Sequence, residues 1–561
     1  MSTERHGRRV AGEGHEPILV IDDLTVRLPE GSDRPHAISK LSLTLAAGEL
    51  VCIVGESGSG KSVTASMVMQ LSPLQVERGS IKLEGEELVG ASQQRLRKLR
   101  GDRMAMIFQE PMTALNPTMR VGDQVAEAIR AHASTADRTD ASSRSVRERV
   151  RALFEDVMLP DPERLMRSYP SELSGGQRQR VMIAMALALD PVLLIADEPT
   201  TALDVTTQAT ILELLKDLQR RRGTAVLFIT HDFGVVADVA DRVLVMQHGV
   251  VVEQGGIDAV LYRPTHAYTR KLIGAVPGLA PRAHHEAAAA ALLEVRELRK
   301  TYGRKGLFGG RHVRAVDGID FNIPRGHTLG IVGESGSGKS TAARCVARLL
   351  DPTGGSVRLG GQEMATLSLR ALHPLRRRVQ VIFQDPYRSL NPRRTIGDSM
   401  IEGPTNYGST PTVALDEARR LLRIVGLDAS ALERYPHQFS GGQRQRIAIA
   451  RALAMQPELL IADEAVSALD VSVQAQVLDL LESVREQMGL SMLFITHDLR
   501  VAARMCDQIA VMQRGAIVEL AQTAQLFAAP QHAYTRQLLG ALPGRAWLSR
   551  RDATTTLSDP T

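Results

Sequence analysis

Two features are scarce in this sequence, and each scarcity excludes a class of protein. Cysteine occurs three times in 561 residues, at Cys52, Cys345 and Cys506, and no two of them form a CxxC pair. This spacing excludes a disulfide framework and a cysteine-rich metal site. No apolar run approaches the roughly 20 residues that span a bilayer, and the first residues lack the apolar core of a secretory signal. We therefore expect a chain without membrane spans that stays on the cytosolic side.

The net charge is small and gives only a weak indication of partners. It is +5, and a basic N-terminus together with Arg545, Arg550 and Arg551 accounts for much of it. Solvated tails explain this pattern best, and attraction to an anionic membrane surface is the weaker alternative. The length is more informative, because 561 residues are too many for one ordinary core and predict two or more domains.

A glycine-rich loop is the stretch around which the rest is organised: Gly55-Glu56-Ser57-Gly58-Ser59-Gly60-Lys61-Ser62. The apolar residues 50–54 before it predict a buried strand, and residues 63–71 after it predict a helix. Strand, glycine-rich loop, Lys-Ser and helix form the arrangement of a phosphate-binding P-loop. Its glycines let backbone N–H groups turn toward a polyphosphate, Lys61 can reach the β- and γ-phosphates, and the Ser62 hydroxyl can ligate Mg²⁺.

The same eight residues recur at positions 333–340, and the repeat extends along the chain. The further motifs of the first copy are Gln109, Ser174-Gly175-Gly176-Gln177, Asp197-Glu198 and His231; those of the second are Gln384, Ser440-Gly441-Gly442-Gln443, Asp463-Glu464 and His497. The spacing of the later motifs is identical in the two copies, but the first copy is longer between the lysine and Ser174. We expect its extra residues in the polar stretch 131–146, as a loop or a helix extension.

Each copy alternates short apolar strands with helical patterns, which predicts an α/β sheet of the P-loop type. The stretches between Gln109 and Ser174, and between Gln384 and Ser440, predict a separate helical lobe. The predicted domains are a flexible tail at 1–16, a first nucleotide-binding domain at 17–280, a linker at 281–291, a second domain at 292–545 and a flexible tail at 546–561.

Two acidic residues in each copy carry the candidate chemistry. Asp197 and Asp463 end apolar strands, where a carboxylate can hold Mg²⁺ directly or through water. Glu198 and Glu464 follow, and a carboxylate there can polarise a water for attack on the γ-phosphate. The alternative, that Asp-Glu only solvates a strand end, is weakened by the P-loop upstream in both copies. The predicted metal residues are Ser62, Gln109, Asp197, Ser340, Gln384 and Asp463.

On these motifs the chain resembles the ATP-binding cassette (ABC) ATPases from about Leu19 to about Leu542, because Ser-Gly-Gly-Gln is that family's signature. The resemblance implies two tandem ABC nucleotide-binding domains of the P-loop NTPase fold, each with a RecA-like α/β core, an antiparallel β subdomain and a helical lobe. It implies that each ATP lies between the P-loop of one copy and the signature of the other. It also implies ATP and Mg²⁺ as ligands.

The resemblance assigns roles to individual positions. The implied catalytic residues are Glu198, His231, Glu464 and His497. The implied nucleotide-binding residues of the first copy are Gly55, Ser57, Gly58, Gly60, Lys61, Ser62, Val63, Gln109, Ser174, Gly175, Gly176 and Gln177. Those of the second copy are Tyr302, Gly333, Ser335, Gly336, Gly338, Lys339, Ser340, Thr341, Gln384, Ser440, Gly441, Gly442 and Gln443.

The two copies depart from each other at two points. The family usually stacks an aromatic side chain on adenine; Tyr302 fits that role in the second copy, but Leu28 stands at this position in the first. Asp-Glu-Pro-Thr in the first copy becomes Asp-Glu-Ala-Val in the second. Because Glu464 is kept, we expect no loss of hydrolysis there, but weaker nucleotide binding at the first site.

A second repeated stretch, at 265–277 and again at 531–543, resembles the extension of the dipeptide, oligopeptide and nickel importer ATPases. This implies an importer motor, most simply for short peptides, with two integral-membrane permease subunits and an extracytoplasmic substrate-binding protein as partners. It implies a peripheral location on the cytoplasmic face of the inner membrane and no nucleic-acid partner. Many members bind an iron–sulfur cluster near this extension, but no cysteine lies there, so we expect none.

Two alternatives stay open. Within the importers, the cargo can be glutathione, a nickel chelate, an opine or an oligosaccharide instead of a dipeptide or oligopeptide. In a different class, soluble tandem-cassette ATPases act on ribosomes. Those proteins carry a long charged helical linker, whereas the linker here is short and rich in alanine, which disfavours them.

Overall fold

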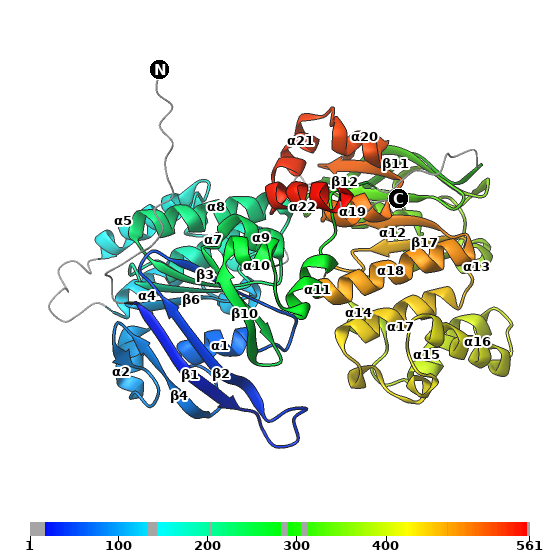
Figure 1. Ribbon diagram of the computed structural model, residues 1–561. Coiled ribbons are helices and arrows are strands. Elements are labelled where there is room, and N and C mark those ends of the chain that lie inside the picture. The colour runs from blue at the N-terminus through cyan, green and yellow to red at the C-terminus, as the bar shows by residue number, and fades with distance from the viewer. Residues whose placement is uncertain are drawn as a thin grey trace. The chain divides into compact units, whose positions relative to one another are not determined.

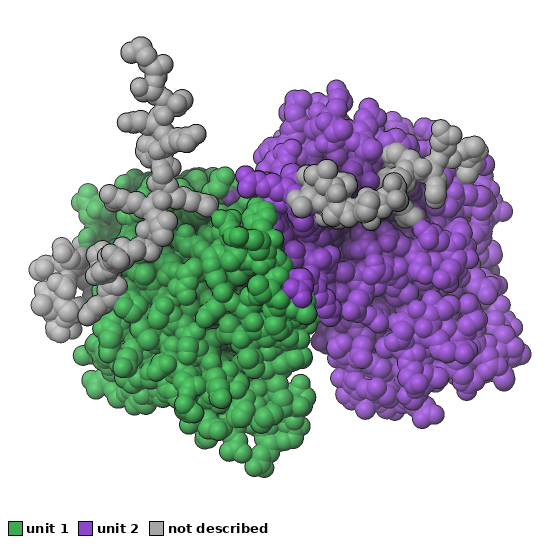
Figure 2. Space-filling view, viewed as in Figure 1, with its two compact units in different colours: residues 1–201, 210–269 green, residues 202–209, 270–561 purple. Residues whose placement is uncertain are grey.

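The computed structural model describes residues 17–132, 143–201, 203–281, 290–303, 312–467 and 469–557. The predicted tail at 1–16, residues 282–289 of the predicted linker and residues 133–142 lie outside these ranges. The chain divides into two compact units (Figure 2): unit 1 comprises Met1–Thr201 and Thr210–Thr269, and unit 2 comprises Ala202–Ala209 and Arg270–Thr561.

A six-stranded sheet forms the centre of each unit. In unit 1 the strand order is β10-β9-β3-β8-β7-β6, and only β10 runs antiparallel to its neighbour. Its strands are β3 (Leu50–Val54), β6 (Met104–Ile107), β7 (Leu193–Asp197), β8 (Ala225–Ile229), β9 (Arg242–Gln247) and β10 (Val250–Gly256). Every residue of β3, β7 and β8 is buried, as expected for parallel strands covered on both faces.

Unit 2 repeats this sheet with the order β16-β17-β18-β13-β19-β20, again with one antiparallel pair at the β20 edge. Its strands are β13 (Thr328–Val332), β16 (Val379–Ile382), β17 (Leu459–Asp463), β18 (Ser491–Ile495), β19 (Gln508–Gln513) and β20 (Ala516–Gln522). In both units one strand, β8 or β18, therefore lies between the strand that ends in the predicted Asp and the strand that leads into the P-loop.

A second, antiparallel sheet of four strands is present in each unit. Unit 1 has β1 (Leu19–Arg27), β2 (His36–Leu45), β4 (Val76–Leu83) and β5 (Glu86–Glu87), in the order β2-β1-β4-β5. Unit 2 has β11 (Ala291–Tyr302), β12 (Val313–Pro324), β14 (Gly354–Leu359) and β15 (Gln362–Glu363), in the order β12-β11-β14-β15. These sheets are the antiparallel β subdomains that the family resemblance implies, so that expectation is confirmed.

Helices cover the sheets and form the predicted lobes. The helices of the first copy are α1 (Lys61–Val68), α2 (Gln93–Leu99), α3 (Pro111–Ala114), α4 (Val121–Arg130), α5 (Ser143–Asp156), α6 (Pro162–Leu165), α7 (Gly175–Ala186), α8 (Val205–Arg222), α9 (Phe233–Val239), α10 (Ile257–Tyr262) and α11 (Ala267–Ala275). Those of the second are α12 (Lys339–Val346), α13 (Leu369–Arg378), α14 (Pro386–Ser389), α15 (Ile396–Asn406), α16 (Pro411–Ile424), α17 (Gly441–Leu453), α18 (Val471–Met488), α19 (Leu499–Met505), α20 (Thr523–Ala528), α21 (Ala533–Gly540) and α22 (Arg545–Leu557).

The helical lobe of unit 2 lies at the opposite end of that unit from β11 and β12 (Figure 1). Its α15, α16 and α17 pack around apolar residues such as Met400, Leu421 and Ile449, all buried. In the first copy residues 131–142 separate α4 from α5, whereas residues 407–410 separate the equivalent α15 and α16. The longer connection therefore falls in the stretch where the sequence predicts the extra residues. None of the helices in the described ranges combines the length and hydrophobicity that a membrane crossing requires.

The predicted flexible tail at 546–561 is wrong for most of its length. Residues 545–557 form α22, and Trp547 and Leu548 are 2% and 0% exposed. The guanidinium of Arg551 lies 5.3 Å from the Trp547 ring centroid and donates to the carbonyls of Ile273 and Val276. The arginines near this end of the chain predict a solvated segment. The segment is ordered instead, because Arg551 finds hydrogen-bond acceptors about 275 residues earlier in the chain.

This correction predicts that Trp547→Ala destabilises the protein. Truncating a buried tryptophan costs about 3–5 kcal/mol, so the urea midpoint of the transition that reports on unit 2 should fall clearly. Ser549→Ala is the matched control, because Ser549 is exposed on the same helix. Equal urea midpoints for the two variants would mean that residues 545–557 do not pack in solution.

Candidate functional site

The P-loop lysine of each copy is buried and held by its own loop. Lys61 is 6% exposed and its Nζ donates to the carbonyls of Gly55 and Glu56 at 2.8 and 2.9 Å. Lys339 is 5% exposed and its Nζ donates to the carbonyls of Gly333 and Glu334 at 2.8 and 2.7 Å. Burial lowers the pKa of Lys339, and nearby carboxylates oppose this shift. The loop thus presents an ammonium group at the start of a helix, where an anion is favoured.

A serine and an aspartate meet beside this lysine. Ser62 Oγ donates to Asp197 Oδ1 at 3.0 Å, and Ser340 Oγ donates to Asp463 Oδ1 at 2.7 Å. Burial raises the pKa of both aspartates, partly offset by these hydrogen bonds. A hydroxyl and a carboxylate side by side are the hard oxygen ligands that Mg²⁺ prefers, so these residues fit the implied metal.

Protein atoms alone do not complete this metal site. Among the described residues, no three His, Cys, Asp or Glu side chains are grouped so that they could hold a metal ion. Mg²⁺ usually keeps waters and binds through one or two protein ligands plus substrate phosphates. The Ser-Asp pair therefore fits a metal that arrives with a nucleotide.

Glu198 lies next to Asp197, and three side chains contact its carboxylate. Gln109 Nε2 donates to Glu198 Oε2 at 3.0 Å, Thr201 Oγ1 donates to the same oxygen at 2.9 Å, and His231 Nδ1 lies 3.2 Å from Oε1. Burial alone would raise the pKa of Glu198, but the hydrogen bonds from His231 and Thr201 and the charges of His231 and Lys61 lower it to about 2. The carboxylate is therefore ionised at neutral pH.

The second copy brings the equivalent residues together with fewer contacts. Gln384 Nε2 donates to Glu464 Oε2 at 2.8 Å, and His497 Nδ1 lies 3.7 Å from the same oxygen. Burial acts to raise the pKa of Glu464, but His497 and Lys339 lower it overall. Ser467 stands where Thr201 stands in the first copy, and its hydroxyl donates to the backbone carbonyl of Glu464 instead of the carboxylate.

Both glutamates adopt a backbone conformation that residues with a side chain rarely adopt. The φ angle is +46° at Glu198 and +51° at Glu464. Such left-handed residues cost free energy and cluster at functional sites. The turn lets the carboxylate leave the line of the strand at the point where Asp197 or Asp463 ends it. Thr201 and this turn are features of the site that the sequence did not reveal.

The two signatures begin helices α7 and α17 as capping boxes. Ser174 Oγ accepts from the N–H of Gln177 at 3.3 Å, while Gln177 Oε1 accepts from the N–H of Ser174 at 3.0 Å. Ser440 and Gln443 make the same pair of bonds at 3.3 and 3.0 Å. Both serines are exposed. The motif therefore has a local structural role in addition to the role that the resemblance implies.

The predicted adenine contacts differ in exposure between the copies. Tyr302 ends β11, is 43% exposed, and has Lys300 Nζ at 5.4 Å from its ring centroid. Leu28 follows β1 and packs, partly buried, against the apolar core that includes Leu24 and Val26. An exposed ring can stack on a base, whereas a leucine that is partly committed to the core offers only apolar contact.

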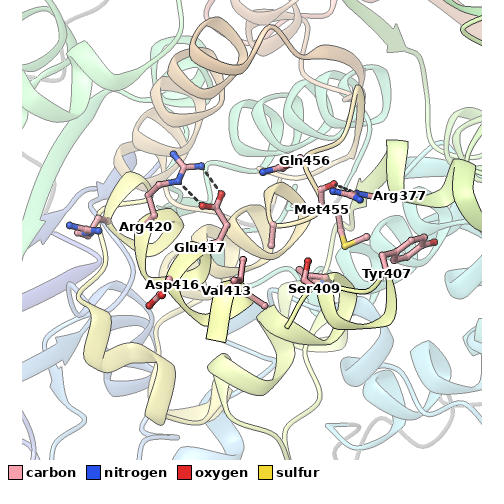
Figure 3. Close-up of a pocket in the computed structure, with 13 residues that line it drawn as sticks. Arg377, Tyr407, Ser409, Val413, Asp416, Glu417, Arg420, Met455 and Gln456 are labelled. Carbon is pink, nitrogen blue, oxygen red and sulfur yellow. Dashed lines mark hydrogen bonds and ion pairs between the residues drawn. The ribbon is translucent and has the colours of Figure 1, made fainter. Parts of the chain in front are cut away.

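A pocket of about 510 Å³ lies in the helical lobe of unit 2, apart from these residues. Figure 3 shows Glu417 and Arg420 joined along α16, with Arg377, Tyr407 and Met455 on the facing side. Arg377 Nε donates to the Met455 carbonyl at 3.4 Å. None of the predicted site residues lines this pocket, so it is not part of the site described above.

Known proteins match both copies. A family model described as ABC transporter matches residues 38–201 and 316–467, and one described as oligopeptide/dipeptide transporter, C-terminal region, matches residues 252–303 and 518–555. The glutathione import ATP-binding protein GsiA of Escherichia coli (strain K12) is 45% identical over 97% of this chain and 92% of its own length. GsiA of Salmonella typhimurium is 45% identical over 94% of this chain and 89% of its own length.

A solved structure also matches: the ATP-binding cassette MJ0796, as a dimer in a post-hydrolysis state bound to ADP and Pi. It is 29% identical, covers 41% of this chain and 98% of its own chain, and has a TM-score of 0.38.

The matched regions restart in the second half of the chain, as the repeat in the sequence predicts. Of the two classes that the sequence left open, the family matches support the importers, because the C-terminal region of oligopeptide/dipeptide transporters follows each cassette. The chain thus belongs to the ABC transporter family, as a two-cassette, import-coupled ATPase subunit of the oligopeptide/dipeptide type.

Proposed function

We propose that this chain drives a binding-protein-dependent importer of short peptides, and that glutathione is the first cargo to test. The observation that carries the proposal is the presence, in each copy, of a Ser-Asp pair and a Gln-Glu pair followed by the extension of the oligopeptide/dipeptide transporters. Glutathione is a short peptide, and relatives that are 45% identical carry it in their name.

The proposed roles in the first copy follow from the contacts described. Lys61 and the P-loop amides bind the β- and γ-phosphates, and Ser62 and Asp197 hold Mg²⁺. When bound, Mg²⁺ neutralises charge on the phosphates. Glu198 accepts the proton of the attacking water, and Gln109 orients that water. His231 bonds a γ-phosphate oxygen. The second copy uses its equivalent residues: Lys339, Ser340, Asp463, Glu464, Gln384 and His497.

We propose that the signature of the opposite copy completes each site. The site of Lys61 would take Ser440, Gly442 and Gln443, and the site of Lys339 would take Ser174, Gly176 and Gln177. Support comes from the exposed, capped starts of α7 and α17, because a helix N-terminus favours phosphate charge. Closure of this kind would exclude water and complete the electrostatics only when ATP is present.

Two integral-membrane permease subunits and an extracytoplasmic binding protein are the proposed partners, which would place the chain on the cytoplasmic face of the membrane. The docking surfaces would be the grooves beside residues 109–117 and 384–392. In support, a pocket of about 680 Å³ in unit 2 is lined by Gln384, Pro386 and Tyr387 together with Gln445 and Asp463. A helix docked there would touch both the helical lobe and the ATP-site glutamine.

We propose ATP and Mg²⁺ as the only cofactors, without an iron–sulfur cluster. The extension regions 252–303 and 518–555 contain no cysteine. All three cysteines are buried elsewhere, and burial raises the pKa of their thiols. A buried, protonated thiol is a poor cluster ligand.

Replacing each proposed base tests the catalytic assignment. Glu198→Gln or Glu464→Gln keeps the shape of the side chain but removes the base, so hydrolysis at that site should fall about 100-fold or more while ATP binding persists. Hydrolysis and equilibrium ATP binding are measured on the same purified chains. Wild-type hydrolysis in each single variant would show that the carboxylate is not the base.

Reconstitution tests the cargo. The chain is placed in proteoliposomes with candidate permease subunits and a candidate binding protein from the same organism, and ATP hydrolysis is followed as candidate cargoes are added. We expect glutathione or a dipeptide to stimulate hydrolysis and an oligosaccharide to leave it unchanged. Stimulation by a nickel chelate, an opine or an oligosaccharide alone would replace the peptide assignment.

The difference between Leu28 and Tyr302 predicts unequal ATP affinities. An aromatic stack on a base is worth about 1–3 kcal/mol, and even about 1.4 kcal/mol is a tenfold change in affinity. The first site should therefore bind ATP more weakly than the second, and Leu28→Tyr should narrow the gap. The measurement is ATP titration of chains that carry Lys61→Ala or Lys339→Ala, one at a time. Equal affinities would show that another group contacts the first adenine.

A further inference from the structure

One peptide bond in each P-loop is held from two sides. The carbonyl of Gly55 accepts from Lys61 Nζ at 2.8 Å, and the N–H of the next residue, Glu56, donates to the hydroxyl of Tyr268 at 3.2 Å. The second copy repeats this: Gly333 accepts from Lys339 at 2.8 Å, and the N–H of Glu334 donates to Tyr534 at 3.1 Å. The C=O and the N–H belong to one planar unit, so neither can rotate without the other.

Because a glycine precedes this peptide bond, the orientation of the bond depends on the two hydrogen bonds from Lys61 and to Tyr268. Gly55 has φ +154°, a conformation that L side chains rarely adopt, and a Cβ there would collide with the carbonyl of Met246. Glycine allows many backbone angles at little cost, so no side chain at this position restrains the peptide. The bond to Tyr268 supplies a restraint from outside the loop.

Both tyrosines lie in the extension, and hydrogen bonds anchor the extension to the core sheet. Tyr268 and Tyr534 are 6% and 4% exposed. In the first copy Glu253 of β10 accepts from the N–H groups of Thr265 and His266 at 2.6 and 3.2 Å, and His266 Nδ1 accepts from the N–H of Tyr268 at 3.2 Å.

The second copy is built in the same way. Glu519 of β20 accepts from the N–H groups of Gln531 and His532 at 2.8 and 2.9 Å, and His532 Nδ1 accepts from the N–H of Tyr534 at 3.2 Å. The repetition of every contact makes a chance arrangement a poor explanation.

We propose that Tyr268 and Tyr534 are positioning residues that orient the P-loop lysine through the peptide bond before Glu56 or Glu334. The inference rests on the proposed role of Lys61 and Lys339 in phosphate binding. A free peptide could rotate the carbonyl away from the ammonium group, so the lysine would have to be ordered when ATP binds. Ordering the lysine costs free energy and therefore lowers the affinity for ATP. It raises the KM for ATP more than it lowers kcat.

The test uses chains with one active site. In the Lys339→Ala chain, Tyr268→Phe removes one hydroxyl, and ATP should bind to the first site about two- to tenfold more weakly. In the Lys61→Ala chain, Tyr534→Phe should weaken the second site likewise. Tyr262→Phe is the matched control, because Tyr262 lies in the same extension with 41% of its surface exposed, and it should change neither affinity.

Three readouts separate positioning from a general loss of structure. In the full chain Tyr268→Phe and Tyr534→Phe together should raise the KM for ATP, leave kcat within about twofold and lower the unfolding midpoint far less than Trp547→Ala does. Unchanged affinity, or a fall in kcat at constant KM, would overturn the inference, as would an equal effect of Tyr262→Phe. If Lys61→Ala and Lys339→Ala chains each still bind two ATP molecules, the phosphate-site assignment fails instead.

Discussion

Two adjacent carboxylates at the end of a buried strand are the constraint on which the rest of each copy depends. Asp197 and Glu198 follow four buried residues of β7, and the same charges repel each other at close range. Burial by itself acts to raise the pKa of both. The pKa of the glutamate nevertheless falls, because Lys61 at the start of α1 and His231 after β8 stabilise its charged form. Gln109, after β6, donates a further hydrogen bond to it.

The pKa values of the two carboxylates move in opposite directions, which supports the different roles proposed for them. The pKa of Asp197 rises, mainly because of burial, and the Ser62 hydroxyl and the charge of Lys61 oppose the rise. A cation would be the natural further partner for it. The pKa of Glu198 falls to about 2, so it remains an anion that is already bonded on both oxygens. It suits an oriented water better than a second cation.

In the second copy, fewer of the hydrogen bonds described above reach the glutamate carboxylate. Ser467, at the position equivalent to Thr201, donates to the backbone carbonyl of Glu464 instead of its carboxylate, and the distance from His497 to Glu464 is 3.7 Å, compared with 3.2 Å from His231 to Glu198. A carboxylate with fewer hydrogen-bond partners loses less free energy when those bonds break during a reaction. It is also held less firmly in position before the reaction begins. The copies therefore differ around the proposed base as well as at the position proposed to contact adenine.

Local patterns were sufficient to predict the parts of the fold that depend on neighbours in sequence. The run 50–54 is β3 with every residue buried, Asp197 and Asp463 are the last residues of β7 and β17, and each signature starts a helix. The repeat and the family resemblance extended this to the fold class. What failed depends on distant partners: α22 is ordered by contacts with Ile273 and Val276, which no periodicity within 545–557 could indicate.

The site follows the same division. Lysine, serine, aspartate, glutamate, glutamine and histidine were all identified from motifs that recur in both copies, and the structure brings them together in each copy. Thr201 was missed because the exchange of threonine for serine at 467 is conservative in sequence, yet the two hydroxyls bond different acceptors. Tyr268 and Tyr534 were visible only as part of a repeated stretch. Each accepts a hydrogen bond from a P-loop residue that is 212 or 200 positions away in the sequence, and only the fold brings the two residues together.

The size of the tyrosine contact limits what the extension can do to the motor. A single neutral hydrogen bond contributes about 0.5–1.5 kcal/mol, whereas several groups, His231, Thr201 and Lys61, act together against burial to lower the pKa of Glu198 to about 2. In the proposed role, the extension would therefore adjust the ATP affinity of each P-loop, but it would not change the contacts around Glu198 and Glu464. Glu253 and Glu519 fix the extension to the core sheet, and the tyrosine hydroxyls connect it to the P-loop, so the contacts of the extension described above lead to the P-loop and not to Glu198 or Glu464.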